Sequence, residues 1–201
     1  LFSRQRIDSA VHLAFLMRPE RNASAAWRVN VGGTQNLLAA GLGSGVTSII
    51  YLSSTTVYGA HPDNPPMMTE ESPVRPIKGF QYGEHKAESE RLLQRFSQDN
   101  PEVSVAILRC CPVMGPGADN FVSRALLRPV LVAVRGHDPP LQLIHEDDVT
   151  EAIAGCLLQG GRGTYNLAGR GVLPWGEMAR TLEATVVTLL AFLLYPLTEA
   201  A

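Results

Sequence analysis

The amino-acid sequence predicts an α/β protein built on a parallel sheet with helices on both faces. Short apolar runs, one of them rich in β-branched residues, alternate along the 201 residues with longer segments of helical periodicity. The order strand, helix, strand, helix, strand is typical of parallel sheets with right-handed crossover connections. The composition, 45% hydrophobic and 18% charged, fits a globular protein with one sizeable core.

The first half of the chain contains two predicted strands and two predicted helices. A buried strand is expected at Ser9–Phe15, and the segment Ala25–Leu42 after it has helical periodicity. The apolar face of that helix is expected to contain Trp27, Val31, Leu37 and Leu38. The run Thr47–Ser54 predicts the second strand. After a proline-rich loop, residues 82–98 have strong helical propensity.

The second half continues the alternation with shorter elements. Further strands are predicted at Val103–Arg109, Leu141–Ile144 and Gly163–Gly169. A helix is expected at residues 149–159, with Asp147 or Asp148 as its N-terminal cap. Gly160 directly follows this segment and is expected to end the helix.

Charge and cysteine content argue against several classes of protein. The formal net charge is −2 and no block of Lys and Arg occurs, which speaks against a nucleic-acid partner. The three cysteines lack metal-ligand spacing, so we expect no metal site and reduced thiols in a cytoplasmic protein. No signal peptide is visible. The apolar segment Val186–Leu197 is too short to span a membrane, and we expect a buried helix or an interface segment there.

The glycine-rich stretch Gly41–Val46, with the sequence GLGSGV, is similar at first sight to a dinucleotide-binding loop. The fingerprint of such loops is G-x-G-x-x-G, placed after a strand and at the start of a helix. Here the glycines alternate, a predicted helix precedes the stretch, and a predicted strand follows it. The stretch is therefore predicted to end a helix and to lead into a short loop.

Tyr82 and Lys86 have a spacing that points to chemistry. They lie four residues apart on a predicted helix, so their side chains share one face. A nearby ammonium favours the phenolate and lowers the pKa of a tyrosine from its usual value near 10. Such a tyrosine can exchange a proton with a hydroxyl or carbonyl group. Taken alone, the pair is equally compatible with a surface tyrosine beside a solvated lysine.

Other motifs occur in a fixed order around this pair. In chain order they are HLAF, NVGGTQNLL, YLSSTTVYG, YGEHK, LRCCPVMGPG and IHEDDV. Over about residues 9–168 the chain resembles the extended short-chain dehydrogenase/reductase family. The resemblance is to its NAD-dependent epimerase/dehydratase branch, which acts largely on nucleotide-linked sugars. It implies a Rossmann-like, doubly wound αβα sandwich that is incomplete at the N-terminus and has a small, partial C-terminal substrate lobe.

The resemblance implies catalytic roles for three residues. Tyr82 falls on the acid/base of the family, and Lys86 on the lysine that lowers its pKa and holds the nicotinamide ribose. Ser54 falls on the residue that hydrogen-bonds the reacting substrate oxygen. The implied cofactor is NAD or NADP, with NAD favoured by the resemblance.

Further cofactor contacts follow from the same resemblance. Ala14 and Ser53 fall where strand ends touch the cofactor, and Cys110 falls beside the nicotinamide. For Cys110, simple packing is the alternative. Asn30 matches an asparagine whose role is partly structural, so a contact to the cofactor and a helix hydrogen bond both stay open.

On the substrate side, the resemblance implies contacts by Ser54, Thr55 and Asn120, a nucleotide-sugar substrate and a homodimer. Dehydratases of the family commonly carry an Asp-Glu pair directly after the catalytic serine or threonine. Thr55 and Thr56 stand at that place, which favours an epimerase or a simple dehydrogenase. The alternatives are an enzyme for a non-sugar substrate and a non-catalytic protein that lacks a grip on the cofactor.

The resemblance also divides the chain. Residues 1–115 would form a partial NAD(P)-binding domain and residues 116–201 a partial substrate-binding region, of which 141–168 return to the first domain. The phosphate-binding loop and the first strands of the family have no counterpart here. A fragment, the omission of disordered stretches and a shortened descendant are the three explanations. We expect the native protein to contain the missing strands, because a parallel sheet must be covered on both faces.

Overall fold

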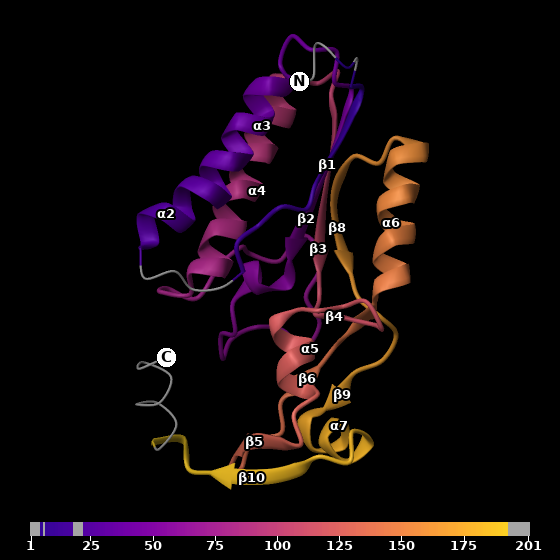
Figure 1. Cartoon of the computed structure of the whole chain (residues 1–201). Coiled ribbons are helices and arrows are strands. Elements are labelled where there is room, and N and C mark those ends of the chain that lie inside the picture. Colours follow the sequence, from indigo (N-terminus) through magenta and orange to yellow (C-terminus); the bar gives the residue numbers. More distant parts are fainter. Residues whose placement is uncertain (1–4, 6, 18–21, 193–201) are drawn as a thin grey trace. The chain divides into compact units, whose positions relative to one another are not determined.

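The largest sheet of the described structure is parallel and has the strand order β1-β2-β3-β8 (Figure 1). Its strands are β1 (Ser9–His12), β2 (Ser48–Ser54), β3 (Ser104–Cys110) and β8 (Gly163–Leu167). Every pairing between neighbours is parallel, which confirms the predicted type of sheet.

The computed structural model describes residues 5, 7–17 and 22–192. They divide into two compact units. The first unit comprises the chain up to Cys111 together with Asp147–Leu167, and it contains the whole parallel sheet. The second unit comprises Pro112–Glu146 together with the chain from Ala168 onward.

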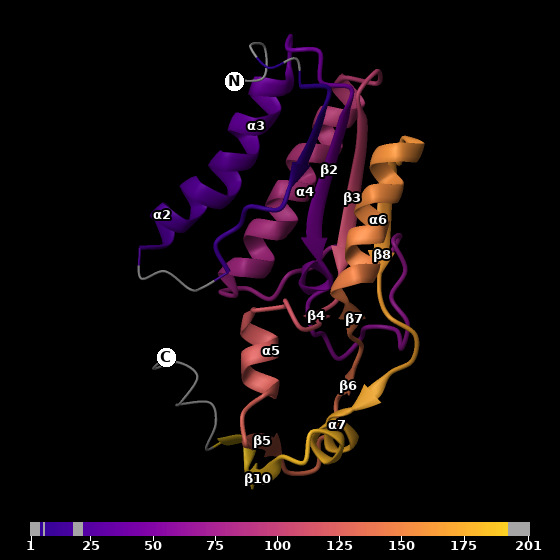
Figure 2. The ribbon, with the colours of Figure 1, turned by 45° about the vertical axis from the view of Figure 1, so that its right-hand side comes forward.

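Helices cover both faces of the sheet in the first unit. They are α3 (Gly33–Gly41) and α4 (Gln81–Asp99) on one face and α6 (Glu146–Gln159) on the other (Figures 1 and 2). This three-layer arrangement confirms the predicted α/β class. Helix α4 confirms the helix predicted at residues 82–98 and is one residue longer at each end.

Side chains alternate along β2 and β3, so each strand contributes to two cores. Ile49 and Tyr51 of β2 pack with Ile107 of β3 on the side of α4. Ile50 and Leu108 belong to the core on the side of α6. All five side chains are at most 2% exposed, and burying each of the four aliphatic ones contributes roughly 1.5–3 kcal/mol to stability. Burial on both faces explains why these strands read as continuous apolar runs.

The helix before β2 is interrupted. It begins as α2 (Ala23–Trp27), passes through a π-helical turn at Arg28–Gly32, and continues as α3. Val31 is fully buried as predicted, whereas Trp27 is 43% exposed and does not lie on the buried face. A π turn departs from the 3.6-residue period, so a face predicted from that period does not extend through it.

The stretch Gly41–Val46 is a helix end and a loop, as predicted. Helix α3 ends at Gly41, and β2 follows after a short loop. Gly43 and Gly45 have φ values of 70° and 85°, in the left-handed region that favours glycine. These glycines turn the chain from the helix into the strand.

Several predicted boundaries are wrong. The strand predicted at Leu141–Ile144 is divided between β6 (Pro140–Leu141) and β7 (Ile144–His145), which belong to different sheets, and the strand predicted at Gly163–Gly169 ends at Leu167. The first strand ends at His12 and not at Phe15, because the chain leaves the sheet and the backbone of Leu16 bonds to the Asn30 side chain. Helix α6 already begins at Glu146, so Asp147 and Asp148 lie in its first turn and neither is its cap.

The second unit consists of short strands and two short helices. Its elements are β4 (Val113–Met114), α5 (Phe121–Leu126), β5 (Val130–Val134), β6 (Pro140–Leu141), β7 (Ile144–His145), β9 (Leu173–Pro174), α7 (Trp175–Thr181) and β10 (Thr185–Leu189). The pairs β4–β7 and β5–β10 are parallel, and β6–β9 is antiparallel.

The prediction of a buried helix in the apolar tail is wrong for Thr185–Leu189, whereas Ala191 and Phe192 are helical and Phe192 is exposed. Thr185–Leu189 is a strand, because its β-branched residues pair with the valine-rich β5. Val186 and Val187 are each 42% exposed. Residues 193–197 of the tail lie outside the described residues. Among the helices that are described, none has both the length and the apolar character needed to cross a membrane.

The packing of α4 can be tested with Leu93, which is fully buried in the core between this helix and the sheet. We expect Leu93→Ala to lower the free energy of unfolding by about 2–5 kcal/mol, because it leaves a cavity. The control is Leu158→Ala on α6, where the side chain is 85% exposed and the loss should stay below about 0.5 kcal/mol. Equal losses in urea unfolding would contradict the packing described.

Candidate active site

The carboxyl ends of β2 and β3 bring the predicted site residues of these strands together. The strand register pairs Ser53 with Arg109 and Ser54 with Cys110. Ligands of open parallel sheets bind at this edge. Ser54 ends β2 with extended backbone and caps the 3₁₀ turn Thr55–Tyr58.

Tyr82 and Lys86 lie in the first two turns of α4, next to the end of β2. The Ser54 hydroxyl lies close enough to Tyr82 to oppose the rise in the pKa of the phenol that burial causes. The Lys86 ammonium nitrogen, Nζ, lies 5.8 Å from the centre of the Tyr82 ring and donates to the Leu52 carbonyl oxygen at 2.6 Å. Three of the predicted site residues are therefore neighbours in space.

Aromatic rings surround the Lys86 side chain. Nζ lies 3.9 Å from the ring centre of Phe15, in the segment after β1, and 4.7 Å from that of Tyr51. Burial lowers the pKa of Lys86 to about 7, and the negative charge of Glu90 opposes this shift. The lysine can therefore gain or lose its proton near neutral pH.

The acidity of Tyr82 differs from the expectation. Burial raises the pKa of Tyr82 above its usual value, and the nearby Ser54 hydroxyl offsets this only in part. The spacing predicts that Lys86 lowers the pKa of the phenol, but burial of Lys86 favours its own uncharged form. In this structure Ser54, and not Lys86, is the group that favours the phenolate.

Asn30 anchors the segment that follows β1. Its side-chain oxygen accepts from the Leu16 backbone N–H at 2.7 Å, and its Nδ2 donates to the Leu16 carbonyl at 3.1 Å. Nδ2 also bonds His85 Nδ1 on α4 at 3.2 Å. Asn30 is 1% exposed. Its two hydrogen bonds to Leu16 hold the backbone of the segment after β1, in which Ala14 is exposed.

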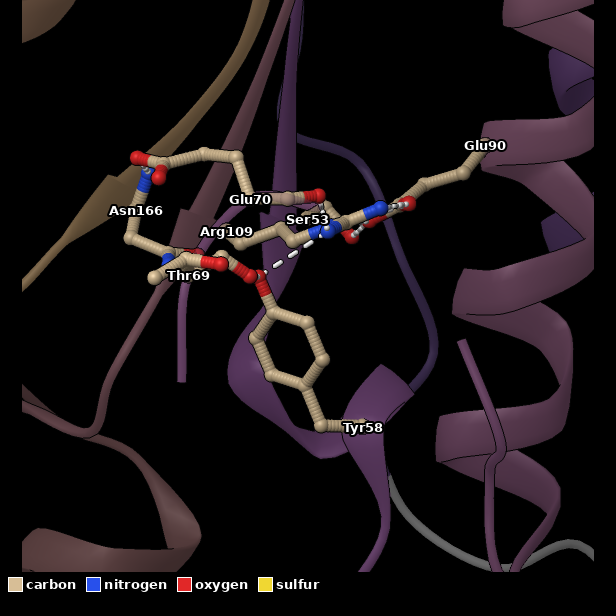
Figure 3. A network of polar contacts seen from close by, with 7 residues as sticks. All are labelled: Ser53, Tyr58, Thr69, Glu70, Glu90, Arg109 and Asn166. Carbon is tan, nitrogen blue, oxygen red and sulfur yellow. Dashed lines mark hydrogen bonds and ion pairs between the residues drawn. The ribbon is translucent and has the colours of Figure 1, made fainter. Parts of the chain in front are cut away.

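A buried ion pair joins α4 to β3 (Figure 3). Arg109 donates from Nη2 and Nε to the Glu90 carboxylate at 2.8 and 3.1 Å, and the two side chains are 3% and 2% exposed. Ser53 donates to the same carboxylate at 2.5 Å. The charges of this pair are thus compensated by several hydrogen bonds inside the core.

The other side of Arg109 holds the loop before α4 (Figure 3). Its Nη1 donates to the Tyr58 hydroxyl oxygen at 2.9 Å and to the Glu70 carbonyl oxygen at 3.0 Å. Tyr58 in turn donates to the Asn166 side chain on β8 at 2.6 Å, and the Asn166 backbone N–H donates to the Glu70 carboxylate at 2.7 Å. Ser53, Arg109 and Asn166 form one row across the sheet.

The remaining predicted site residues lie in different surroundings. Thr55 opens the 3₁₀ turn and is half-buried. Cys110 is 5% exposed, and burial raises the pKa of its thiol to about 12, so the thiol stays protonated at neutral pH. Asn120 belongs to the second unit, where its side chain caps α5 by accepting from the Val122 and Ser123 backbone N–H groups.

Comparison with known proteins identifies the family. The sequence profile described as "NAD dependent epimerase/dehydratase family" matches residues 1–168. The chain belongs to the NAD-dependent epimerase/dehydratase family. This confirms the resemblance read from the motifs.

Related sequences of this family are longer than the chain. An uncharacterised protein of Mycobacterium tuberculosis is 31% identical over 177 residues, which are 87% of this chain and 47% of the relative. A dTDP-glucose 4,6-dehydratase of Streptomyces griseus is 30% identical over 187 residues, 87% of this chain and 55% of the relative. The chain thus spans about half the length of these relatives.

Solved structures of epimerases and dehydratases share the fold. The UDP-glucuronic acid 4-epimerase of Bacillus cereus, in complex with UDP-glucuronic acid and NAD, has a TM-score of 0.80 at 21% identity. The alignment covers 94% of this chain and 65% of the epimerase. A dTDP-glucose 4,6-dehydratase of Streptomyces venezuelae with NAD bound reaches 0.77 at 25% identity and covers 94% and 63%. These likenesses confirm the predicted Rossmann-like fold class.

Sequence reasoning missed Glu90, Arg109 and Phe15. A signal for the first was present: Glu90 lies four residues after Lys86 and therefore on the same face of the helix. Arg109 ends an apolar strand at a position that faces α4, where a charge requires a partner. No spacing rule connects Phe15 with Lys86, because the two meet only through the tertiary fold.

The lowered pKa of the buried Lys86 predicts how the free energy of unfolding depends on pH. An unfolded lysine keeps its proton up to about pH 10.4, whereas Lys86 loses it at about 7 in the fold. Between these values the unfolded state binds more protons, so the free energy of unfolding rises with pH by up to about 1.4 kcal/mol per unit. We expect this slope in the wild type relative to Lys86→Met, measured by urea unfolding from pH 7 to 9.

The control for this experiment is Lys78→Met, which removes an exposed lysine from the loop before α4. The difference between wild type and this control should not change with pH. A pH-independent difference between wild type and Lys86→Met would show that Lys86 keeps its ordinary pKa.

Proposed function

We propose that this chain carries the catalytic part of an NAD-dependent enzyme that acts on a hydroxyl carbon of a nucleotide-linked sugar. The observation behind the proposal is the cluster of Ser54, Tyr82 and Lys86 at the carboxyl end of β2, in a chain of the epimerase/dehydratase family. Two relatives in this family are named as a dTDP-glucose 4,6-dehydratase and a UDP-glucose 4-epimerase. Solved structures with the same fold contain NAD.

The residues at the sheet edge suit a nicotinamide cofactor. Lys86 uses one N–H for the Leu52 carbonyl and has two further donors in its protonated form. The exposed Ala14 follows β1 at the same edge of the sheet, on the segment that Asn30 holds. Ser53 is occupied by Glu90 and would support this edge rather than contact a ligand. When bound, nicotinamide accepts or returns a hydride at the substrate carbon.

The proton of the reaction is assigned to Tyr82. As a phenolate it takes the proton of the substrate hydroxyl, and as a phenol it returns a proton to the carbonyl oxygen. Ser54 donates a hydrogen bond and thereby orients the reacting oxygen and favours the phenolate. A protonated Lys86 adds a positive charge that strengthens this effect below about pH 7.

Among the reactions of the family, we propose epimerase or simple dehydrogenase chemistry. Elimination of water requires an additional acid and base beside the catalytic hydroxyl. Thr55 and Thr56 follow Ser54, and neither can take up or release a proton near neutral pH. Asn120 remains a proposed substrate contact, and the second unit is then the substrate-binding part.

The homodimer is also part of the proposal. Trp27 and Val29, on the helix that precedes β2, are 43% and 53% exposed. Trp27 and His85 of α4 line the same open groove, and their rings meet edge to face. Exposed apolar side chains beside a groove support association of two copies through this surface.

The proposed function is tested by Tyr82→Phe in the full-length protein, assayed with NAD and either UDP-glucose or dTDP-glucose. We expect turnover to fall by about 10²–10⁴-fold, because the proton-transfer group is removed. The affinity for NADH, followed by fluorescence titration, should stay within about twofold, since the ring is kept.

Two outcomes would contradict the proposal in different ways. Unchanged turnover in Tyr82→Phe would remove the assigned role from this tyrosine. Failure of the wild-type protein to bind either NADH or NADPH would rule out the dehydrogenase function itself and favour a non-catalytic member of the family.

A further inference from the structure

The Ser54 hydroxyl has both of its acceptor positions filled by one residue. The Thr56 backbone N–H donates to Ser54 Oγ at 3.2 Å, and the Thr56 hydroxyl donates to the same oxygen at 3.0 Å. A serine hydroxyl offers two lone pairs and one hydrogen. What Ser54 can still give is therefore its single O–H.

Tyr82 lies close to this remaining hydrogen. The first turn of α4 packs against the turn after β2, since a Cβ on Gly83 would lie 3.2 Å from the Thr56 carbonyl oxygen. Burial raises the pKa of Tyr82, and the nearby Ser54 hydroxyl opposes that rise. Because both lone pairs of Ser54 are taken, Ser54 can act on the tyrosine oxygen only as a donor. A donor in this position stabilises a phenolate or a carbonyl oxygen, and it stabilises a phenol or an alcohol less.

We propose that Thr56 is a positioning residue that restricts Ser54 to donating its single O–H, to Tyr82 in the free enzyme and to the reacting substrate oxygen when substrate is bound. This inference rests on the proposed function of Ser54 and Tyr82. Thr56 acts through Ser54 and contributes its hydroxyl; its neighbour Thr55 has no corresponding bond to Ser54 among the described contacts. A chain of two hydroxyl groups, from Thr56 through Ser54, also polarises the last O–H.

The backbone around Thr56 holds it in place for this task. Ser54 is extended, with φ −147° and ψ 147°, and the 3₁₀ turn begins directly after it. The Thr56 carbonyl accepts from the Gly59 N–H at 3.1 Å, which closes the turn. Gly59 itself has φ 68° and no room for a side chain, because a Cβ would lie 2.3 Å from the Arg75 carbonyl oxygen. The turn therefore fixes both donors relative to Ser54.

Without the Thr56 hydroxyl, Ser54 regains a free lone pair. It can then accept a hydrogen bond from a phenol or an alcohol as well as donate one. The preference for the negatively charged form of Tyr82 weakens in consequence. The other titratable groups near Tyr82 stay in place, namely Lys86 on α4, Tyr51 on β2 and Cys110 on β3.

The test is the ionisation of Tyr82, followed by ¹³C NMR of the full-length protein labelled at the tyrosine Cζ atoms. The Tyr82 signal is assigned by its absence in Tyr82→Phe. We expect Thr56→Val to raise the pKa of Tyr82 by about 0.5–1 unit, the effect of one hydrogen bond. Thr56→Ser keeps a hydroxyl and should restore the wild-type value. Thr56→Ala serves as a second variant if the valine disturbs folding.

The decisive comparison uses Ser54→Ala as a second background. If Thr56 acts through Ser54, adding Thr56→Val to Ser54→Ala changes the pKa of Tyr82 no further. The same upward shift with and without Ser54, or no shift in Thr56→Val, overturns the proposal. In turnover assays, Thr56→Val should lower kcat about fivefold and leave KM unchanged.

The NMR measurement does not depend on turnover. An upward shift in Thr56→Val together with unchanged turnover in Tyr82→Phe would support the hydroxyl arrangement and contradict the proposed function. The reverse result would leave the proposed function intact and overturn only the role of Thr56.

Discussion

The buried ion pair between Glu90 and Arg109 is the interaction on which the arrangement of the site depends. A charge inside a protein core is stable only when it is paired and hydrogen-bonded. Here each oxygen of the Glu90 carboxylate has donors, and burial of Arg109 is offset by hydrogen bonds and charge from Glu90 that raise its pKa. The pair therefore restricts how α4 can lie on β2 and β3, beyond what nonspecific apolar packing imposes.

The ion pair is linked to the residues of the proposed reaction through direct neighbours. Glu90 holds Ser53, whose neighbour Ser54 contacts Tyr82, and Glu90 lies one helical turn after Lys86. Strand β2 and helix α4 thus place Ser54, Tyr82 and Lys86 next to one another. The turn after β2 then sets the direction of the Ser54 hydrogen through Thr56. Packing of α4 on the sheet thus places Ser54 beside Tyr82, and the two hydrogen bonds from Thr56 leave Ser54 only its O–H to donate.

The sequence predicted those features that depend on local patterns. The parallel sheet, the extent of α4 and the helix end at Gly41 follow from apolar periodicity and from glycine. It failed where tertiary structure decides: the π turn moved Trp27 off the buried face, and pairing with β5 made Thr185–Leu189 a strand. The direction of the pKa shift of Tyr82 also could not be read from a four-residue spacing, because its largest cause is burial, which depends on the tertiary fold.

Urea unfolding of two glutamate variants of α4 tests most directly whether the buried ion pair holds this helix on the sheet. Glu90→Gln removes the charge that compensates the buried Arg109, and we expect the free energy of unfolding to fall by about 3–5 kcal/mol. Glu88→Gln breaks the exposed pair with Arg91 on the same helix, and it should change stability little. A small, equal effect of both variants would contradict the view that the buried pair holds α4 and the site together.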